Sequence, residues 1–174
     1  MRVVWLAILK TTLVNFADRK KLIAKALLES NPRVKTVLEK TGGREGKYRV
    51  QQLVFLAGVK TTLAEYRESG CVMRVDLASC YFSPRLSTER LKIAKSVRAC
   101  ENVLVLFAGV GSFALVIARH SQAKKTICVE LNPVAVKYAE ENVLLNKCCE
   151  RVEVIKADAA CLPPRLRAWA NRIV

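Results

Sequence analysis

The sequence predicts an α/β protein whose central part is a doubly wound parallel sheet. Three observations favour this fold class. An apolar run of residues 102–106 leads directly into Gly109-x-Gly111-x-x-Ala114, a helical pattern follows, and a second apolar run of residues 126–129 ends on Glu130. This order of strand, glycine turn, helix, strand and acid is typical of the nucleotide-binding half of such folds.

The glycine turn and the acid have separate physical roles in a nucleoside site. Gly109 and Gly111 allow a sharp turn and a close approach of ligand to backbone, and the following helix offers free N–H groups. Glu130 can accept two hydroxyl groups of a ribose. The glycine spacing leaves three alternatives open: a dinucleotide, S-adenosylmethionine, or a tight turn without any ligand.

Composition indicates a globular protein that meets a polyanion. The 174 residues suffice for one domain or two small ones, and 52% of them are hydrophobic. Lys and Arg number 30 against 15 acids, which gives a net charge of +15. The alternative is a basic protein without such a partner. A membrane surface is disfavoured because no predicted helix concentrates cations opposite a broad apolar face.

The seven cysteines predict neither a metal site nor a secreted disulfide framework. They form no C-x-x-C pair, and the single histidine, His120, ends a helical pattern as a cap or surface group. We therefore expect no metal and reduced cysteines in a cytoplasmic protein, with disulfides an alternative only in a hyperthermophile. The apolar residues 3–9 are too few to cross a bilayer and predict a buried strand instead.

The first part of the chain, residues 1–78, is predicted to be a small α+β domain on the RNA side. A helix is expected over residues 18–30 with Asp18 as its N-cap, stopped by Asn31 and Pro32. Residues 41–46 are expected to form a loop. Short strands are expected over residues 3–9, 34–38, 48–56, 61–66 and 71–76.

The second part, residues 79–174, is predicted to carry the parallel sheet. Asn132 and Pro133 suit the first turn of a helix that continues to Asn146. The other expected elements are a helix over 86–97, a strand over 152–156, a helical turn over 165–170 and a fourth strand over 172–174. Because open parallel sheets continue beyond a fourth strand, we expect a shortened chain, or a partner chain that completes the sheet.

Three segments resemble one known family. The decapeptide of residues 81–90, Tyr-Phe-Ser-Pro-Arg-Leu-Ser-Thr-Glu-Arg, is followed by Leu-Phe-Ala-Gly-Val-Gly at 106–111 and Val-Glu-Leu-Asn-Pro at 129–133. Together they closely resemble the archaeal and eukaryotic tRNA (guanine-37-N1) methyltransferases. The resemblance, over residues 22–174, implies a Rossmann-like class I methyltransferase domain, incomplete at its C-terminus, after a small α+β domain. Members also carry an upstream tRNA-elbow domain and a downstream Asn-Leu-Pro motif, which this sequence lacks.

The resemblance implies S-adenosylmethionine as the cofactor and the anticodon region of tRNA as the partner. It matches Arg49 to a catalytic arginine that donates to guanine O6, and Glu89 to the proposed base for the N1 proton. Val105 and Ser112 depart from the acid and the proline that are common in the family. Cofactor contacts are implied at seven positions: Tyr81, Arg85, Phe107, Gly109, Gly111, Glu130 and Asp158.

These residue types fit the chemistry of methyl transfer to guanine. N1 is a poor nucleophile until it loses its proton, and the charge that then moves onto O6 is stabilised by a guanidinium. Sequence spacing alone favours a solvated helix residue for Glu89 and a surface strand residue for Arg49, and only the resemblance selects them as site residues. Three functional alternatives also remain: a non-catalytic tRNA- or cofactor-binding remnant, the related aminocarboxypropyl transferase of wybutosine synthesis, and a nicotinamide dehydrogenase.

Overall fold

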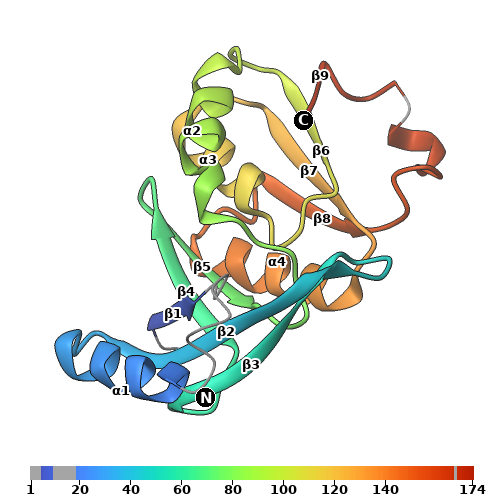
Figure 1. The fold of residues 1–174 in the computed structure, drawn as a ribbon. Helices are drawn as coiled ribbons and strands as arrows, with labels where there is room; N and C mark the ends of the chain where they lie inside the picture. Colours follow the sequence, from blue (N-terminus) through green and yellow to red (C-terminus); the bar gives the residue numbers. More distant parts are fainter. Residues whose placement is uncertain (1–4, 10–18, 167) are drawn as a thin grey trace.

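The computed structural model describes residues 5–9, 19–166 and 168–174. In these residues the strands form three sheets: β1-β2-β3, the pair β4-β5, and β8-β7-β6-β9 (Figure 1). The first sheet and helix α1 lie at one end of the molecule, and the four-stranded sheet lies at the other. The expected N-cap Asp18 and the expected strand residues 3 and 4 fall outside the described residues.

The first sheet combines one parallel and one antiparallel pair. β1 (Trp5–Leu9) runs parallel to β2 (Val34–Glu45), which pairs antiparallel with β3 (Val50–Gly58). Helix α1 (Lys20–Ser30) packs on β2 and β3 through its buried Ala24. The opening strand was predicted to be buried, and this is wrong for Ile8, which is 47% exposed because β1 lies at the sheet edge.

The loop predicted over residues 41–46 is also wrong, because β2 continues through it to Glu45. The pairing register with β3 shifts between Thr41 and Arg44, so Gly42 and Gly43 form a β-bulge. The polar, glycine-rich sequence of this bulge is also typical of a loop, which explains the wrong prediction. The Gln51 side chain supports this bulge by donating to the carbonyl of Thr41 at 3.0 Å. The paired strands of the hairpin therefore extend to Glu45, beyond the end of the apolar pattern from which the strand was predicted.

The second sheet is a hairpin of β4 (Leu63–Glu68) and β5 (Cys71–Asp76) that docks on helix α4 (Pro133–Leu145). The amide of the fully buried Asn142 accepts from Arg74 N at 2.7 Å and donates to Arg74 O at 3.0 Å. Asn146, one turn later, bonds Val72 N and O at 2.9 and 2.6 Å. The side chains of one α4 residue and of its C-cap residue thus bond β5 as a neighbouring strand would.

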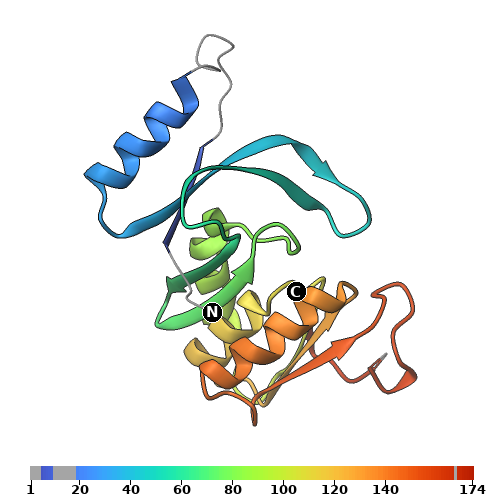
Figure 2. The ribbon, with the colours of Figure 1, turned by 90° about the horizontal axis from the view of Figure 1, so that it is seen from below.

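The four-stranded sheet is parallel throughout, as predicted. Its strands are β6 (Asn102–Leu106), β7 (Lys125–Glu130), β8 (Val152–Lys156) and β9 (Arg172–Ile173). Side chains such as Val103 and Cys128 face the helices α2 (Ser87–Ser96) and α3 (Ser112–His120). The opposite face, with Leu104 and Ile127, packs against Leu162, Leu166 and Trp169. These three belong to the segment that follows β8 (Figure 2).

The decapeptide connects the hairpin to the parallel sheet. It contains the 3₁₀ turn η2 (Pro84–Leu86) and the first turn of α2, so the helix predicted over 86–97 begins at Ser87. Arg90 is 1% exposed and forms a two-point ion pair with Glu68 of β4, while also donating to the Ser83 carbonyl at 3.2 Å. The helical turn expected over 165–170 is the shorter 3₁₀ turn η3 (Pro164–Leu166).

Candidate functional site

A crevice of about 380 Å³ lies at the carboxyl ends of β6 and β7, where open α/β sheets bind ligands. One wall comes from the glycine turn and the start of α4, and the other comes from the tip of the β2–β3 hairpin. Five of the nine predicted site residues line it: Arg49, Tyr81, Phe107, Gly109 and Glu130. Residues from both parts of the chain therefore meet at one site.

The carboxylate of Glu130 ties the glycine turn to β7. Gly109 N donates to its Oε2 at 2.7 Å, and Leu131 N and Asn132 N donate to its Oε1 at 2.9 and 2.8 Å. A carboxylate offers about four acceptor positions, and three of them are used. The geometry thus leaves capacity for about one further donor, where the sequence predicted two ribose hydroxyls.

Two aromatic rings flank the glycine turn. Phe107 is 78% exposed and holds a left-handed backbone conformation with φ of 53°, which costs free energy in a residue with a Cβ. Tyr81 is partly exposed and comes from the decapeptide. Their faces are available to a flat or apolar ligand, and both residues also line a narrow extension of about 50 Å³ that leads toward Leu86 and Arg90.

The two glycines of the turn serve different purposes. Gly109 borders the crevice, and a Cβ there would lie 3.4 Å from the Tyr81 carbonyl oxygen. Gly111 has φ of 82°, is absent from the crevice wall, and packs against α4, where a Cβ would lie 3.4 Å from that of Ala139. Gly111 therefore sets the approach of α3 to α4, and Gly109 shapes the surface offered to a ligand.

The hairpin tip brings positive charge to the crevice. Arg44, Lys47, Tyr48 and Arg49 all line it, and the Arg44 guanidinium lies 4.0 Å from the ring centroid of Tyr81 in a cation–π contact. Only Arg49 was predicted. The signal for the others was the basic, glycine-rich composition of residues 42–49, where a loop was predicted up to residue 46 and a strand from residue 48.

The remaining predicted residues lie outside the crevice wall. Arg85 and Glu89 are exposed on η2 and α2, although their neighbours Leu86 and Arg90 line its narrow extension. Asp158 follows β8, next to β7 in the sheet, and its Oδ1 accepts from Ala160 N at 2.9 Å. These three residues therefore lie near the site, two of them next to lining residues in the sequence and one after a neighbouring strand, but none of them lines the cavity.

Cys80 lies on a second, smaller hollow beside the crevice. Burial raises the pKa of the Cys80 thiol to about 12, so this group is uncharged at neutral pH and a poor nucleophile. Within the described residues, no group of three or more His, Cys, Asp or Glu side chains could hold a metal ion. The same part of the chain contains no helix that is long and apolar enough to span a membrane.

Comparison with known proteins identifies the family. Residues 64–174 match the TRM5/TYW2 methyltransferase domain, and residues 6–61 match the TYW2 N-terminal domain. The chain belongs to the TRM5/TYW2 methyltransferase family. The two matches meet between residues 61 and 64, whereas the sequence analysis placed a boundary after residue 78, and that boundary stays a prediction.

Relatives of this TRM5/TYW2 member are known from archaea and eukaryotes. The tRNA (guanine(37)-N(1))-methyltransferase Trm5b of Pyrococcus abyssi is 41% identical over 73% of the chain and 38% of the relative. The tRNA (guanine(37)-N(1))-methyltransferase 1 of Vitis vinifera is 37% identical over 80% of the chain and 23% of the relative. The chain thus spans less than half the length of these two curated relatives.

Solved structures of the family share the fold. A complex of aTrm5 with tRNALeu superposes with a TM-score of 0.86 at 32% identity, covering 98% of this chain and 49% of the other. TYW2 of P. horikoshii in complex with MeSAdo superposes with a TM-score of 0.80 at 30% identity, covering 99% and 60%. The predicted family and the α/β fold with its parallel sheet are confirmed.

Proposed function

We propose that this chain carries the catalytic part of an S-adenosylmethionine-dependent tRNA methyltransferase that modifies N1 of guanine 37. The observation that carries the proposal is the crevice where Glu130 and Gly109 meet Arg49 of the hairpin, in a chain of this family. Relatives named as tRNA (guanine(37)-N(1))-methyltransferases, and the family member solved with tRNALeu, support the substrate.

The residues present fit S-adenosylmethionine as the cofactor. Glu130 retains about one acceptor position for a ribose hydroxyl, and the rings of Phe107 and Tyr81 offer apolar faces beside the backbone of Gly109. When bound, the cofactor supplies an electrophilic methyl group on its sulfonium. We assign Arg85 and Asp158 to the outer parts of the same site by resemblance alone, because neither lines the crevice.

Arg49 is proposed to stabilise the charge on the target base. It lines the crevice, and its side chain forms no hydrogen bond or ion pair with the described residues, so its donors remain available. A guanidinium held near O6 stabilises the negative charge that develops as N1 loses its proton, and it cannot lose its own proton.

Glu89 is proposed to accept the N1 proton. It is exposed in the first turn of α2, and its carboxylate forms no hydrogen bond or ion pair within the part of the chain described, so both oxygens are free. General-base catalysis requires one of them to come within hydrogen-bond reach of N1 when the substrate binds. The buried Arg90 next to it anchors this turn through Glu68.

Transfer of an aminocarboxypropyl group is the second candidate, because residues 6–61 match the TYW2 N-terminal domain. Both reactions use the same sulfonium cofactor but break different bonds. Methyl transfer leaves S-adenosylhomocysteine, whereas aminocarboxypropyl transfer leaves methylthioadenosine. The third candidate is a chain that binds tRNA or cofactor without catalysis.

The decisive experiment incubates the 174-residue chain with S-adenosylmethionine and a tRNA transcript carrying guanine 37. Mass analysis of the nucleosides and the by-products identifies the transferred group. We expect 1-methylguanosine and S-adenosylhomocysteine, and a transcript with adenine 37 is the substrate control. Methylthioadenosine with an aminocarboxypropylated nucleoside would instead establish the second candidate. Binding of tRNA without either product would establish the third.

Two variants test the assigned roles in the same assay. We expect Glu89→Gln to lower the single-turnover rate by about 10²-fold or more, since loss of a general base typically has this effect. Lys92→Gln, on the same helix and equally exposed, is the matched control. A Glu89→Gln chain as fast as the parent would remove Glu89 from the mechanism.

A further inference from the structure

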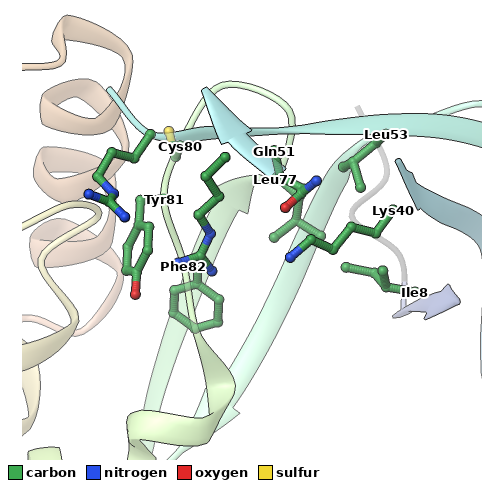
Figure 3. A pocket seen from close by; sticks show the side chains of 10 residues that line it. Ile8, Lys40, Gln51, Leu53, Leu77, Cys80, Tyr81 and Phe82 are labelled. Carbon is green, nitrogen blue, oxygen red and sulfur yellow. The ribbon is translucent and has the colours of Figure 1, made fainter. Parts of the chain in front are cut away.

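The second hollow lies between the β2–β3 hairpin and the start of the decapeptide, and it encloses about 90 Å³ (Figure 3). It shares Arg44, Arg49 and Tyr81 with the crevice, so the two cavities are neighbours. Lys40, Gln51 and Phe82 also point toward it, from the hairpin and from the decapeptide. The mechanism proposed above uses neither Lys40 nor Gln51.

The amide of Gln51 has one satisfied end and one unsatisfied end. Its Nε2 donates to the carbonyl oxygens of Thr41 at 3.0 Å and Gly43 at 3.3 Å, and it lies 3.2 Å from that of Gln52. Because all these neighbours are acceptors, the nitrogen must face them and the oxygen must face away. That oxygen, Oε1, is buried and has no hydrogen-bond partner among the described residues. A buried acceptor without a donor is costly, which indicates a missing donor.

The cations of the hollow are also unsatisfied. Within the described residues, the side chains of Lys40 and Arg49 form no ion pair or hydrogen bond, and the Arg44 side chain has only its contact with the Tyr81 ring. Three positive groups beside one orphaned acceptor call for a ligand that carries a neutral donor close to an anion. The hollow holds only a few water-sized groups, so it has room for the hydroxyl and phosphate edge of a nucleotide and not for a whole ribose or base.

We propose that this hollow binds one edge of the nucleotide next to the target guanine, the edge that carries the 2′-hydroxyl and the 3′-phosphate, with Gln51 Oε1 accepting a hydrogen bond from the hydroxyl. In RNA the 2′-hydroxyl and the 3′-phosphate stand on adjacent ring carbons, which provides a donor and an anion within one small group. Lys40 and Arg44 then contact the phosphate, as cations do in most nucleic-acid complexes. Gln51 makes this contact specific for RNA, because DNA lacks the 2′-hydroxyl.

This inference rests on tRNA being the substrate, and it is tested by binding. The full 174-residue chain is titrated at fixed salt with anticodon stem-loops that carry guanine 37 and a single 2′-deoxy nucleotide at each position around it in turn. We expect one flanking position where the deoxy substitution weakens binding by about fivefold, the effect of one net hydrogen bond.

Variants of Gln51 show whether that loss belongs to this side chain. Gln51→Leu removes both ends of the amide, whereas Gln51→Lys keeps a donor for the carbonyls of the bulge, removes the acceptor and adds a positive charge. The added charge acts on the ribo and deoxy stem-loops alike, so the ratio of the two affinities is the readout. Both variants should bind the ribo and deoxy stem-loops equally well. Gln52→Leu is the matched control, since Gln52 is exposed and bonds Glu45, and it should keep the fivefold difference.

The outcomes separate this inference from the proposed function. A parent chain that methylates guanine 37 but shows the same deoxy penalty in Gln51→Lys overturns the role of Gln51 alone, as does the absence of any sensitive position. A Gln51-dependent penalty without group transfer supports the inference and counts against the proposed reaction. A chain that binds no stem-loop overturns both.

Discussion

Gly109 donates its amide hydrogen to the Glu130 carboxylate across 2.7 Å, and this bond joins the ends of β6 and β7. The same carboxylate accepts the amides of Leu131 and Asn132, so one side chain holds the glycine turn and the start of α4 together. The group proposed to hold the ribose is thus fixed in place before any ligand arrives. Such preorganisation lowers the entropic cost of binding.

Glu130→Gln should weaken binding of S-adenosylhomocysteine by about tenfold to a hundredfold, the range for loss of hydrogen bonds to a charged group. The new amide nitrogen must face the N–H of Gly109 or those of Leu131 and Asn132, so at least one backbone contact is lost in either orientation. Isothermal titration calorimetry gives the affinity. Glu140→Gln, exposed on α4, is the control and should leave it unchanged. If Glu130→Gln and the parent bind S-adenosylhomocysteine equally tightly, Glu130 does not contact the cofactor.

Gly111→Ala should lower the free energy of unfolding by about 1–2 kcal/mol, because the backbone there is left-handed. The added methyl group would lie in van der Waals contact with Ala139, at 3.4 Å, so the cost comes from the backbone conformation. Urea denaturation measures the change. Gly43→Ala, where a Cβ would meet nothing within 4 Å, is the matched control and should have little effect. A variant at Gly111 as stable as the parent would contradict the cost assigned to the left-handed backbone.

Glu68→Gln should destabilise the fold by about 3–5 kcal/mol, since it leaves the buried guanidinium of Arg90 without its countercharge. The exposed pair of Glu65 and Arg67 offers a comparison on the same strand. Glu65→Gln should cost only about 0–1 kcal/mol in the same denaturation experiment. Similar losses of unfolding free energy in the two variants would show that burial of the Arg90–Glu68 pair does not increase its contribution to stability.

Stability should fall as the pH rises from 9.0, the ordinary thiol pKa, toward about 12. Burial raises the pKa of Cys128 and of Cys80 to about 12, so both thiols ionise first in the unfolded chain. The unfolded state then binds fewer protons than the native state, and the free energy of unfolding decreases with pH. Cys128→Ala should flatten this decline in denaturation curves, whereas Cys100→Ala, exposed, should not. If the free energy of unfolding falls with pH as steeply in Cys128→Ala as in the parent, other ionisable groups cause the decline.

The sequence was sufficient for the parallel sheet because its strands are short apolar runs that end in turn residues. β6 and β7 begin and end within a residue of the expected positions, and Asn132 caps α4 as predicted, with its side chain accepting from Val134 N at 3.0 Å. These features depend on neighbours in the chain. The glycine turn and the acid of the crevice were found for the same reason.

The hairpin side of the site depends on contacts between distant residues, so apart from Arg49, which came from the family resemblance, it could not be predicted. Gly42 and Gly43 resemble a loop until Gln51, from the next strand, bonds the carbonyls of the bulge. Arg44 reaches the site only because the hairpin extends over Tyr81. The roles proposed for Glu89 and Asp158 came from family resemblance rather than from any periodicity, and both remain predictions.

Asn142 of α4 and its C-cap residue Asn146 form hydrogen bonds with the main chain of β5 and not with its side chains. Asn142 and Asn146 recognise only the peptide groups of Arg74 and Val72, which every residue except proline presents in the same form. Substitutions at the exposed position 74, even those that reverse its charge, should therefore leave the hydrogen bonds between the hairpin and α4 intact. Only proline at that position would undo it, because proline has no N–H to offer Asn142.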